Sequence, residues 1–120
     1  MIKKEKNNEQ KEFQAAFVKS ALEMIILKFL RTQPIHGYGL IVAIQKNFDV
    51  PVGASTIYPI LEKLEKNNYI TSQWNTEQDR PKKMYNITQK GQETLTHAEN
   101  TFKTFYQKIS EIPLMTKEQT

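Results

Sequence analysis

The chain has 120 residues and a mass of 14.0 kDa, a length that fits one small domain. It contains no cysteine, which excludes disulfides, thiolate metal sites and a thiol nucleophile, and which is typical of the reducing cytoplasm. Seventeen basic and thirteen acidic residues give a net charge of +4 and a pI near 9.2, a balance that favours a polyanionic partner.

The sequence lacks the motifs of enzymes, metal proteins and membrane proteins. No apolar run approaches the ~20 residues of a membrane span, and the polar start, residues 1–8, does not resemble an export signal. The two histidines, His36 and His97, lie far apart. There is no glycine-rich phosphate loop and no nucleophile–base arrangement. We therefore expect no enzyme activity, no cofactor and no metal site.

Apolar residues at three- and four-residue steps predict three helices in the first part of the chain. Residues 1–12 are polar and are expected to form an extension or an exposed first helical turn. Helices are expected over residues 13–30, 38–48 and 54–67, the first of them ended by a turn rich in proline and glycine. The third helix carries one apolar face, made of Ile57, Ile60, Leu61 and Leu64.

After residue 68 the period changes from helical to two, which predicts two short strands and then a long helix. The strands are expected over residues 69–74 and 83–88, joined as a hairpin in which Trp74 packs. The last helix is expected over residues 88–112, before a polar tail at 113–120. Its apolar steps follow the heptad rhythm of a helix packed along another: Leu95, Ala98, Phe102, Phe105, Ile109 and Ile112.

This order predicts a mainly α fold with a small β-hairpin (α+β), a winged helix-turn-helix domain over residues 13–87. The polar side of the third helix suits a major groove about 12 Å wide, and its first turns would reach base edges and phosphates. The basic wing, residues 76–83, suits the DNA backbone. Tyr38 is either a rim residue of the core or a donor to a phosphate. The candidate DNA-binding residues are Tyr38, Ser55, Thr56, Tyr58, Lys63, Arg80, Lys82 and Lys83.

Three segments, in order, resemble the PadR-like family of transcriptional regulators. IHGYGL at 35–40 resembles the family's turn, ASTIYPILEKLE at 54–65 its recognition helix, and RPKKMYNITQKG at 80–91 its wing. The C-terminal part, a single helix, resembles that of the compact subfamily, and this resemblance implies that residues 88–112 serve dimerisation. The resemblance implies a cytoplasmic homodimer that binds an inverted-repeat operator in double-stranded DNA and usually represses.

The resemblance also implies that the first and last helices form the dimer, and that a small apolar or phenolic effector relieves repression in some members. The expected interface residues are Phe17, Leu22, Ile25, Leu95, Phe102, Phe105, Tyr106 and Ile109. The aromatic residues expected to stack on an effector are Phe13, Phe17, Phe102, Phe105 and Tyr106.

A second class of function is a winged-helix module for protein interaction or assembly that does not read DNA. Three carboxylates near the expected DNA face favour this alternative, those of Glu62, Glu65 and Asp79. Neutralising the nearby cations would leave the function of such a module intact.

Overall fold

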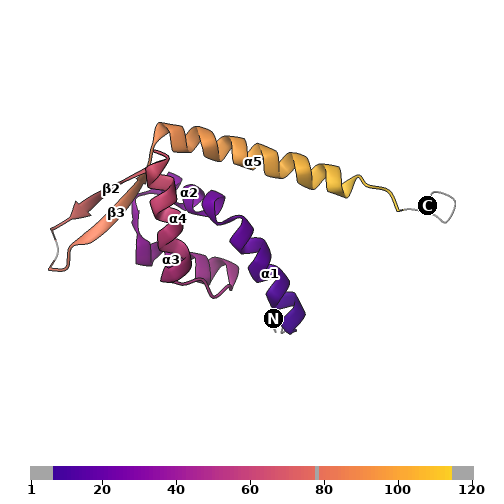
Figure 1. Ribbon diagram of the computed structural model, residues 1–120, viewed down its shortest axis with the longest axis horizontal. Helices are drawn as coiled ribbons and strands as arrows, with labels where there is room; N and C mark the ends of the chain where they lie inside the picture. The colour runs from indigo at the N-terminus through magenta and orange to yellow at the C-terminus, as the bar shows by residue number, and fades with distance from the viewer. Residues whose placement is uncertain (1–6, 78, 115–120) are drawn as a thin grey trace.

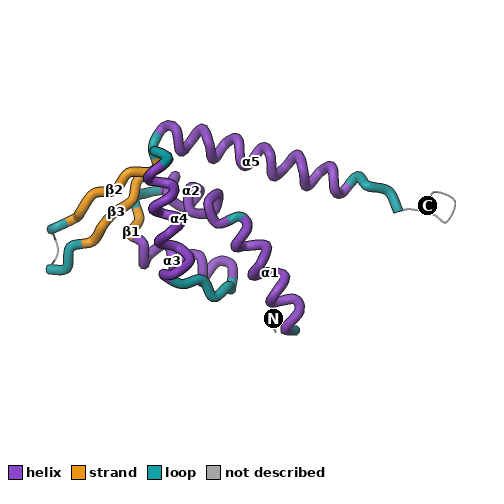
Figure 2. Tube along the Cα trace, viewed as in Figure 1, coloured by secondary structure: helices purple, strands orange, loops and turns teal. Residues whose placement is uncertain are grey.

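The computed structural model describes residues 7–77 and 79–114, which form five helices and three strands. A helical body carries a β-hairpin wing at one side, and the last helix runs across the body and projects beyond it (Figure 1). This mainly helical fold with a small antiparallel sheet confirms the expected class (Figure 2). The elements are α1 (Asn8–Ser20), α2 (Leu22–Thr32), β1 (Ile35–His36), α3 (Gly37–Phe48), α4 (Ala54–Lys66), β2 (Ile70–Asn75), β3 (Lys82–Ile87) and α5 (Gln89–Ser110).

The sheet has one more strand than the sequence predicts. Its order is β1-β3-β2, with both pairings antiparallel. The wing pairs Ile70 with Ile87 at its base and Asn75 with Lys82 at its outer end. β1 has two residues and pairs with the inner part of β3. A strand this short shows no alternation of apolar and polar residues, so the period-two pattern cannot reveal it.

The expected helix over residues 13–30 is wrong, because two helices stand in its place. α1 begins earlier, at Asn8, and α2 begins after a break at Ala21, whose backbone leaves the helical region (φ −107°, ψ 6°). Just before the break, the Ser20 hydroxyl donates to the Phe17 carbonyl at 2.6 Å. α1 is mostly exposed and turns away from the body, whereas α2 is embedded in it (Figure 1). Of the expected termini, residues 1–6 and 115–120 lie outside the described residues.

The core joins the helices of the body to the base of the wing and the start of α5. Apolar residues at helical spacing on α2, α3 and α4 meet there, and their burial excludes water from all three helices. The largest side chains with almost no exposed surface are Leu22, Ile26, Leu40, Ile44, Ile57, Leu61, Leu64, Ile70 and Leu95. Because Leu95 lies in this core, the first turns of α5 belong to the body.

The start of α5 is fixed by a close backbone contact with the turn after α4. The Thr88 hydroxyl caps the helix by accepting from the Gly91 amide at 3.0 Å, and it donates to the Asn68 carbonyl at 2.7 Å. A Cβ at Gly91 would lie 2.1 Å from the Tyr69 carbonyl oxygen. Only glycine allows the two backbones to approach this closely.

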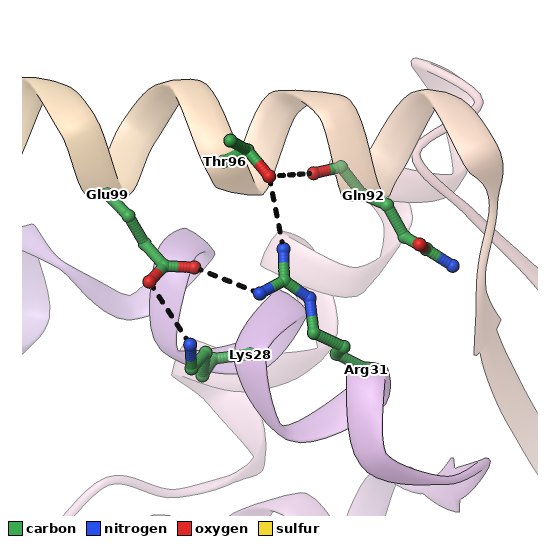
Figure 3. Close-up of polar contacts among 5 residues, drawn as sticks. All are labelled: Lys28, Arg31, Gln92, Thr96 and Glu99. Atoms are coloured by element: carbon green, nitrogen blue, oxygen red, sulfur yellow. Dashed lines mark hydrogen bonds and ion pairs between the residues drawn. The ribbon is translucent and has the colours of Figure 1, made fainter.

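One turn further along, a polar network ties α5 to α2 (Figure 3). Glu99 accepts from Lys28 at 3.1 Å and from Arg31 at 3.3 Å, and Arg31 also donates to the Thr96 hydroxyl at 3.3 Å. The hydrogen bond from Lys28 is the main reason that the pKa of Glu99 lies below its usual range. Together with the close contact at Gly91, this network sets the direction in which α5 leaves the body.

Replacing Gly91 with alanine should destabilise the fold. Alanine favours a helix by about 1 kcal/mol over glycine, but the overlap with the Tyr69 carbonyl should cost about 3 kcal/mol, for a net loss of about 2 kcal/mol in urea denaturation. Gly53→Ala is the matched control, because a Cβ there meets nothing within 4 Å, and its change should stay below about 1 kcal/mol. Equal stability of the two variants would contradict the steric argument.

Replacing Glu99 with glutamine should lower stability at neutral pH by about 0.5–1 kcal/mol, the scale of partly exposed ion pairs. Because folding lowers the pKa of Glu99, its contribution is present above the unfolded pKa and is lost as the pH falls through the folded pKa. The stability difference between wild type and variant should therefore be largest at pH 7 and should shrink as the pH is lowered toward 3. Glu93→Gln, exposed on the same helix, is the control; a loss that is equal at both pH values would rule out the ion pair as its cause.

Candidate nucleic-acid interface

The polar side of α4 faces outward along its whole length. Ile57, Leu61 and Leu64 are buried on one side, and Pro59 and Lys66 are exposed on the other. In the first turn, Ser55 is exposed and Thr56 is half-buried. Because these buried side chains hold one face of α4 against the core, the helix cannot rotate about its axis. The side chains on the opposite face, including those of the first turn, therefore stay on the surface. This arrangement leaves a hydrophilic ridge that no described segment of the chain covers.

The cations of the wing differ in their surroundings. Arg80 lies in the exposed loop between β2 and β3, and Lys82 is exposed at the outer end of β3. The Lys83 ammonium lies 4.0 Å from a carboxylate oxygen of Glu65 and 5.7 Å from the centre of the Tyr85 ring. Lys83 is therefore partly neutralised by α4, whereas Arg80 and Lys82 face outward.

Two tyrosines lie where α3 and α4 begin. Tyr38 is 66% exposed, so most of its side chain is open to solvent, and its role as a donor to a phosphate stays a prediction. The Tyr58 ring lies against Gly37, where a Cβ would come within 2.7 Å of the phenol oxygen. The pKa of the neighbouring His36 is lowered by burial and by the charge of Lys82, so its imidazole is neutral at pH 7. This part of the surface thus offers phenol hydroxyls rather than a histidine cation.

The side chain of Lys63 is paired with a carboxylate of α2. Its ammonium donates to Glu23 of α2 at 2.6 Å, and this hydrogen bond is the main reason that its pKa is raised. The pair lies on the flank of α4 that faces α2, away from the wing. A phosphate would have to compete with Glu23 for this lysine.

Between the wing and the starts of α3 and α4 lies a cleft of about 310 Å³, which we call the wing cleft. Four of the eight candidate DNA-binding residues line it, and the other four, Ser55, Thr56, Lys63 and Arg80, are not part of its lining. Its lining includes Tyr38, Tyr58, Trp74, Lys82, Lys83 and Tyr85. The cleft combines two ammonium groups, phenol hydroxyls and apolar rings.

Trp74 is the residue that the sequence interpretation missed. The expectation that it packs within the hairpin is wrong: Trp74 is 65% exposed and lines the wing cleft. Residues two apart on a strand share a face, so Trp74 points to the same side as Ile70 and Ser72. That alternation was readable in the sequence, but the point at which the helical body stops covering the strand was not.

A second surface lies on α1 and the outer part of α5. The rings of Phe17 and Phe102 meet edge to face, with centroids 6.3 Å apart, and so link the two helices. The other expected aromatic and aliphatic residues there are exposed, namely Phe13, Phe105, Tyr106 and Ile109. Two residues expected at a dimer interface do not belong to this surface: Leu22 (1% exposed) and Leu95 (0%) lie in the core of the protomer and have no side-chain surface to offer a partner.

An apolar cavity of about 260 Å³ lies between α2 and α5, close to this surface. Met24, Ile25 and Phe29 of α2 form one wall and Phe102 of α5 another, with Lys28 at the edge. Of the aromatic residues expected to bind an effector, Phe102 lines the cavity; Phe13, Phe17, Phe105 and Tyr106 are not part of its lining.

The described residues contain no group of three or more histidine, cysteine, aspartate or glutamate side chains placed to hold a metal ion. Among the described helices, none is both long and apolar enough to span a bilayer. The geometry places the outward polar side of α4 beside a cationic hairpin. Comparison with known proteins shows which family has this arrangement.

The family model of the PadR-like transcriptional regulators matches residues 26–97, which include α3, α4 and the whole wing. A comparison with curated proteins gives no significant match.

The matching family and the similar solved structures named here are transcriptional regulators, not enzymes. A PadR family regulator from Eggerthella lenta is 26% identical, with a TM-score of 0.73 over 80% of this chain and 84% of its own. A PadR-like regulator from Bacillus cereus is 25% identical, with a TM-score of 0.72 over 79% of this chain and 93% of its own. A Streptococcus transcriptional regulator is 28% identical, with a TM-score of 0.68 over 78% of this chain and 93% of its own. The chain therefore belongs to the PadR-like family of transcriptional regulators.

Proposed function

We propose that this PadR-like regulator is a homodimeric repressor that binds an inverted-repeat operator in double-stranded DNA. The observation that carries the proposal is the outward polar side of α4 beside the cations of the wing. Each protomer would insert α4 into a major groove, with Ser55 and Thr56 in the first turn near base edges. Arg80 and Lys82 would contact backbone phosphates. Bound there, the protein would block a promoter.

The contacts of Glu65 favour DNA over the alternative of a protein-interaction module. Its carboxylate accepts from the Ser72 hydroxyl at 2.5 Å and lies 4.0 Å from the Lys83 ammonium. Of the three carboxylates that favoured the alternative, Glu65 is thus turned toward the wing and partly neutralised. This pairing neutralises one carboxylate and one ammonium together, and the exposed Arg80 and Lys82 remain as cations of the wing.

Dimerisation is supported by the shape of the protomer and by the apolar residues of α5. The radius of gyration is 18.0 Å, whereas a compact chain of this length has about 14 Å. The outer half of α5 exposes Phe105 and Ile109 on one stripe, with Tyr106 beside it, and Ile112 is exposed just after the helix ends. Covering this stripe with α1 and α5 of a second copy would remove it from water. A twofold axis would then set the two α4 helices one DNA turn apart, about 34–36 Å, or a multiple of it.

The apolar cavity between α2 and α5 supports the proposal that the protein binds a small effector of apolar or phenolic character. Its volume of about 260 Å³ exceeds the roughly 150 Å³ that holds a benzene ring in a protein core. Lys28 at its edge would attract a phenolate, and this lysine also binds Glu99, which ties α5 to α2. A ligand there would shift α5 and with it the spacing of the two DNA-binding helices. The proposed place of action is the cytoplasm, where a repressor meets its operator.

Replacing Lys82 with glutamine should weaken DNA binding and lower the slope of log affinity against log salt by about one unit, because one phosphate contact is lost. The measurement is fluorescence anisotropy of a labelled fragment of the gene's own promoter, with competitor DNA, at several salt concentrations. Lys108→Gln, an equal charge change on the distant end of α5, should leave the slope unchanged. Identical slopes for both variants would remove Lys82 from the interface, and equal affinity for every sequence would argue against a specific operator.

Replacing Ile109 with glutamate should convert a dimer into a monomer, because the new carboxylate would be buried without a partner. Size-exclusion chromatography with light scattering measures the mass directly. Gln107→Glu adds the same charge on the opposite side of α5 and should remain dimeric. A wild-type protein that elutes as a monomer at micromolar concentration would contradict the proposed assembly.

A further inference from the structure

The inner face of the wing ends in a large aromatic ring that the protein itself does not cover. Residues paired across an antiparallel ladder share a face, so the pairs Ile70–Ile87, Ser72–Tyr85 and Trp74–Lys83 form one row. The first two pairs are covered by the body, and Glu65 of α4 reaches the second pair through Ser72. In the third pair, the Lys83 ammonium still lies 4.0 Å from Glu65 of α4, whereas Trp74 is exposed.

Exposure along this row changes abruptly. Ile70 and Tyr85 are buried, whereas Trp74 is 65% exposed, although it points to the same side. An indole buries more apolar surface than almost any other side chain when a partner covers it. In the described part of the chain, Trp74 is therefore open to a partner from outside.

The groups around Trp74 show what kind of partner fits. The wing cleft sets the indole beside the ammonium groups of Lys82 and Lys83 and the phenol hydroxyls of Tyr38 and Tyr58. Cations and hydroxyl donors bind phosphate oxygens, and an exposed ring packs against C–H groups. A deoxyribose with its phosphate offers both kinds of surface within one nucleotide.

We infer that the wing cleft binds one sugar–phosphate unit of duplex DNA, with the Trp74 ring against the deoxyribose. Lys82 and the hydroxyls of Tyr38 and Tyr58 contact the phosphate, and Lys83 stays beside Glu65. In a duplex the faces of the bases are stacked on each other, so the sugar is the apolar surface within reach of the indole. The inference rests on the proposed DNA binding, and it adds a neutral, sequence-independent contact to that function.

An apolar contact has a signature that a cation does not share. Removing the Trp74 ring releases no counterion contact, so affinity falls while the salt slope stays constant. Removing the charge of Lys82 changes both quantities. The two kinds of contact in one cleft can therefore be separated by the same titration.

Trp74 is the single tryptophan of the chain, so the intrinsic fluorescence reports on this position alone. The probe is a labelled mixed-sequence duplex of about 40 base pairs, long enough for two half-sites one turn apart, at low salt. Anisotropy of the label measures binding, and tryptophan emission with acrylamide quenching measures burial of the indole. On binding, the emission should change in step with the anisotropy, and acrylamide should quench it less.

The variants make the same test without fluorescence. Trp74→Ala should bind the duplex about tenfold more weakly with an unchanged salt slope, and Trp74→Phe should recover most of the loss. Gln73→Ala is the matched control, one residue away on the other face of β2, and should bind as the wild type does. Because Trp74 is exposed, all three variants should melt at the wild-type temperature.

The outcomes distinguish this inference from the proposed function. A duplex that does not bind at all would overturn both. A duplex that binds while Trp74 stays open to acrylamide, with Trp74→Ala binding at full strength, would overturn the wing cleft as a backbone site and leave the regulator intact. Protection of Trp74 by a single-stranded oligonucleotide but not by the duplex would overturn the sugar–phosphate assignment and indicate stacking on free bases.

Discussion

Burial of the apolar side of α4 is the constraint on which the interface depends. Ile57, Leu61 and Leu64 are almost completely enclosed by the body, so the helix cannot rotate about its axis. Truncating one of them to alanine would cost about 2–5 kcal/mol, a large share of the stability of a domain this size. The outward position of Ser55 follows from this packing and not from any contact of its own. The same core residues therefore keep the fold together and orient the helix.

Ion pairs on the surface distinguish the lysines that already have a carboxylate partner from those that do not. Glu23 forms an ion pair with Lys63, and Glu65 lies beside Lys83. In the described structure, the charges of both lysines are therefore partly neutralised within the chain. Exposed pairs of this kind are worth at most about 1 kcal/mol, less than a charge-assisted contact to a phosphate in a tight interface. Lys82, for which the described residues show no such ion pair, is ready for DNA without this competition.

The amphipathic helices and the hairpin could be predicted from the sequence because their periodicity reflects burial directly. Three features could not. The break at Ala21 depends on local backbone geometry that no proline or glycine marks. β1 is too short to show a period. The heptad rhythm of α5 runs evenly from Leu95 onward, yet Leu95 belongs to the protomer's own core and Ile109 lies far outside it. A pattern identifies an apolar stripe, but not which neighbour covers each part of it.

The same limit explains why the exposure of Trp74 could not be predicted from the sequence, and it applies to the wing as well as to α5. The wing and α5 both extend past the helical body (Figure 1), and each carries exposed apolar side chains in its outer part, Trp74 on the wing and Phe105 and Ile109 on α5. Thr88 joins the wing to α5, because it follows β3 directly and caps α5. Its hydroxyl also donates a hydrogen bond to the Asn68 carbonyl next to α4. A displacement of α5 would therefore pass through a short, hydrogen-bonded junction to the base of the wing. In a dimer held together by α5, the separation of the DNA-binding surfaces would depend on the rigidity of this junction, which the close approach of Gly91 to Tyr69 supplies.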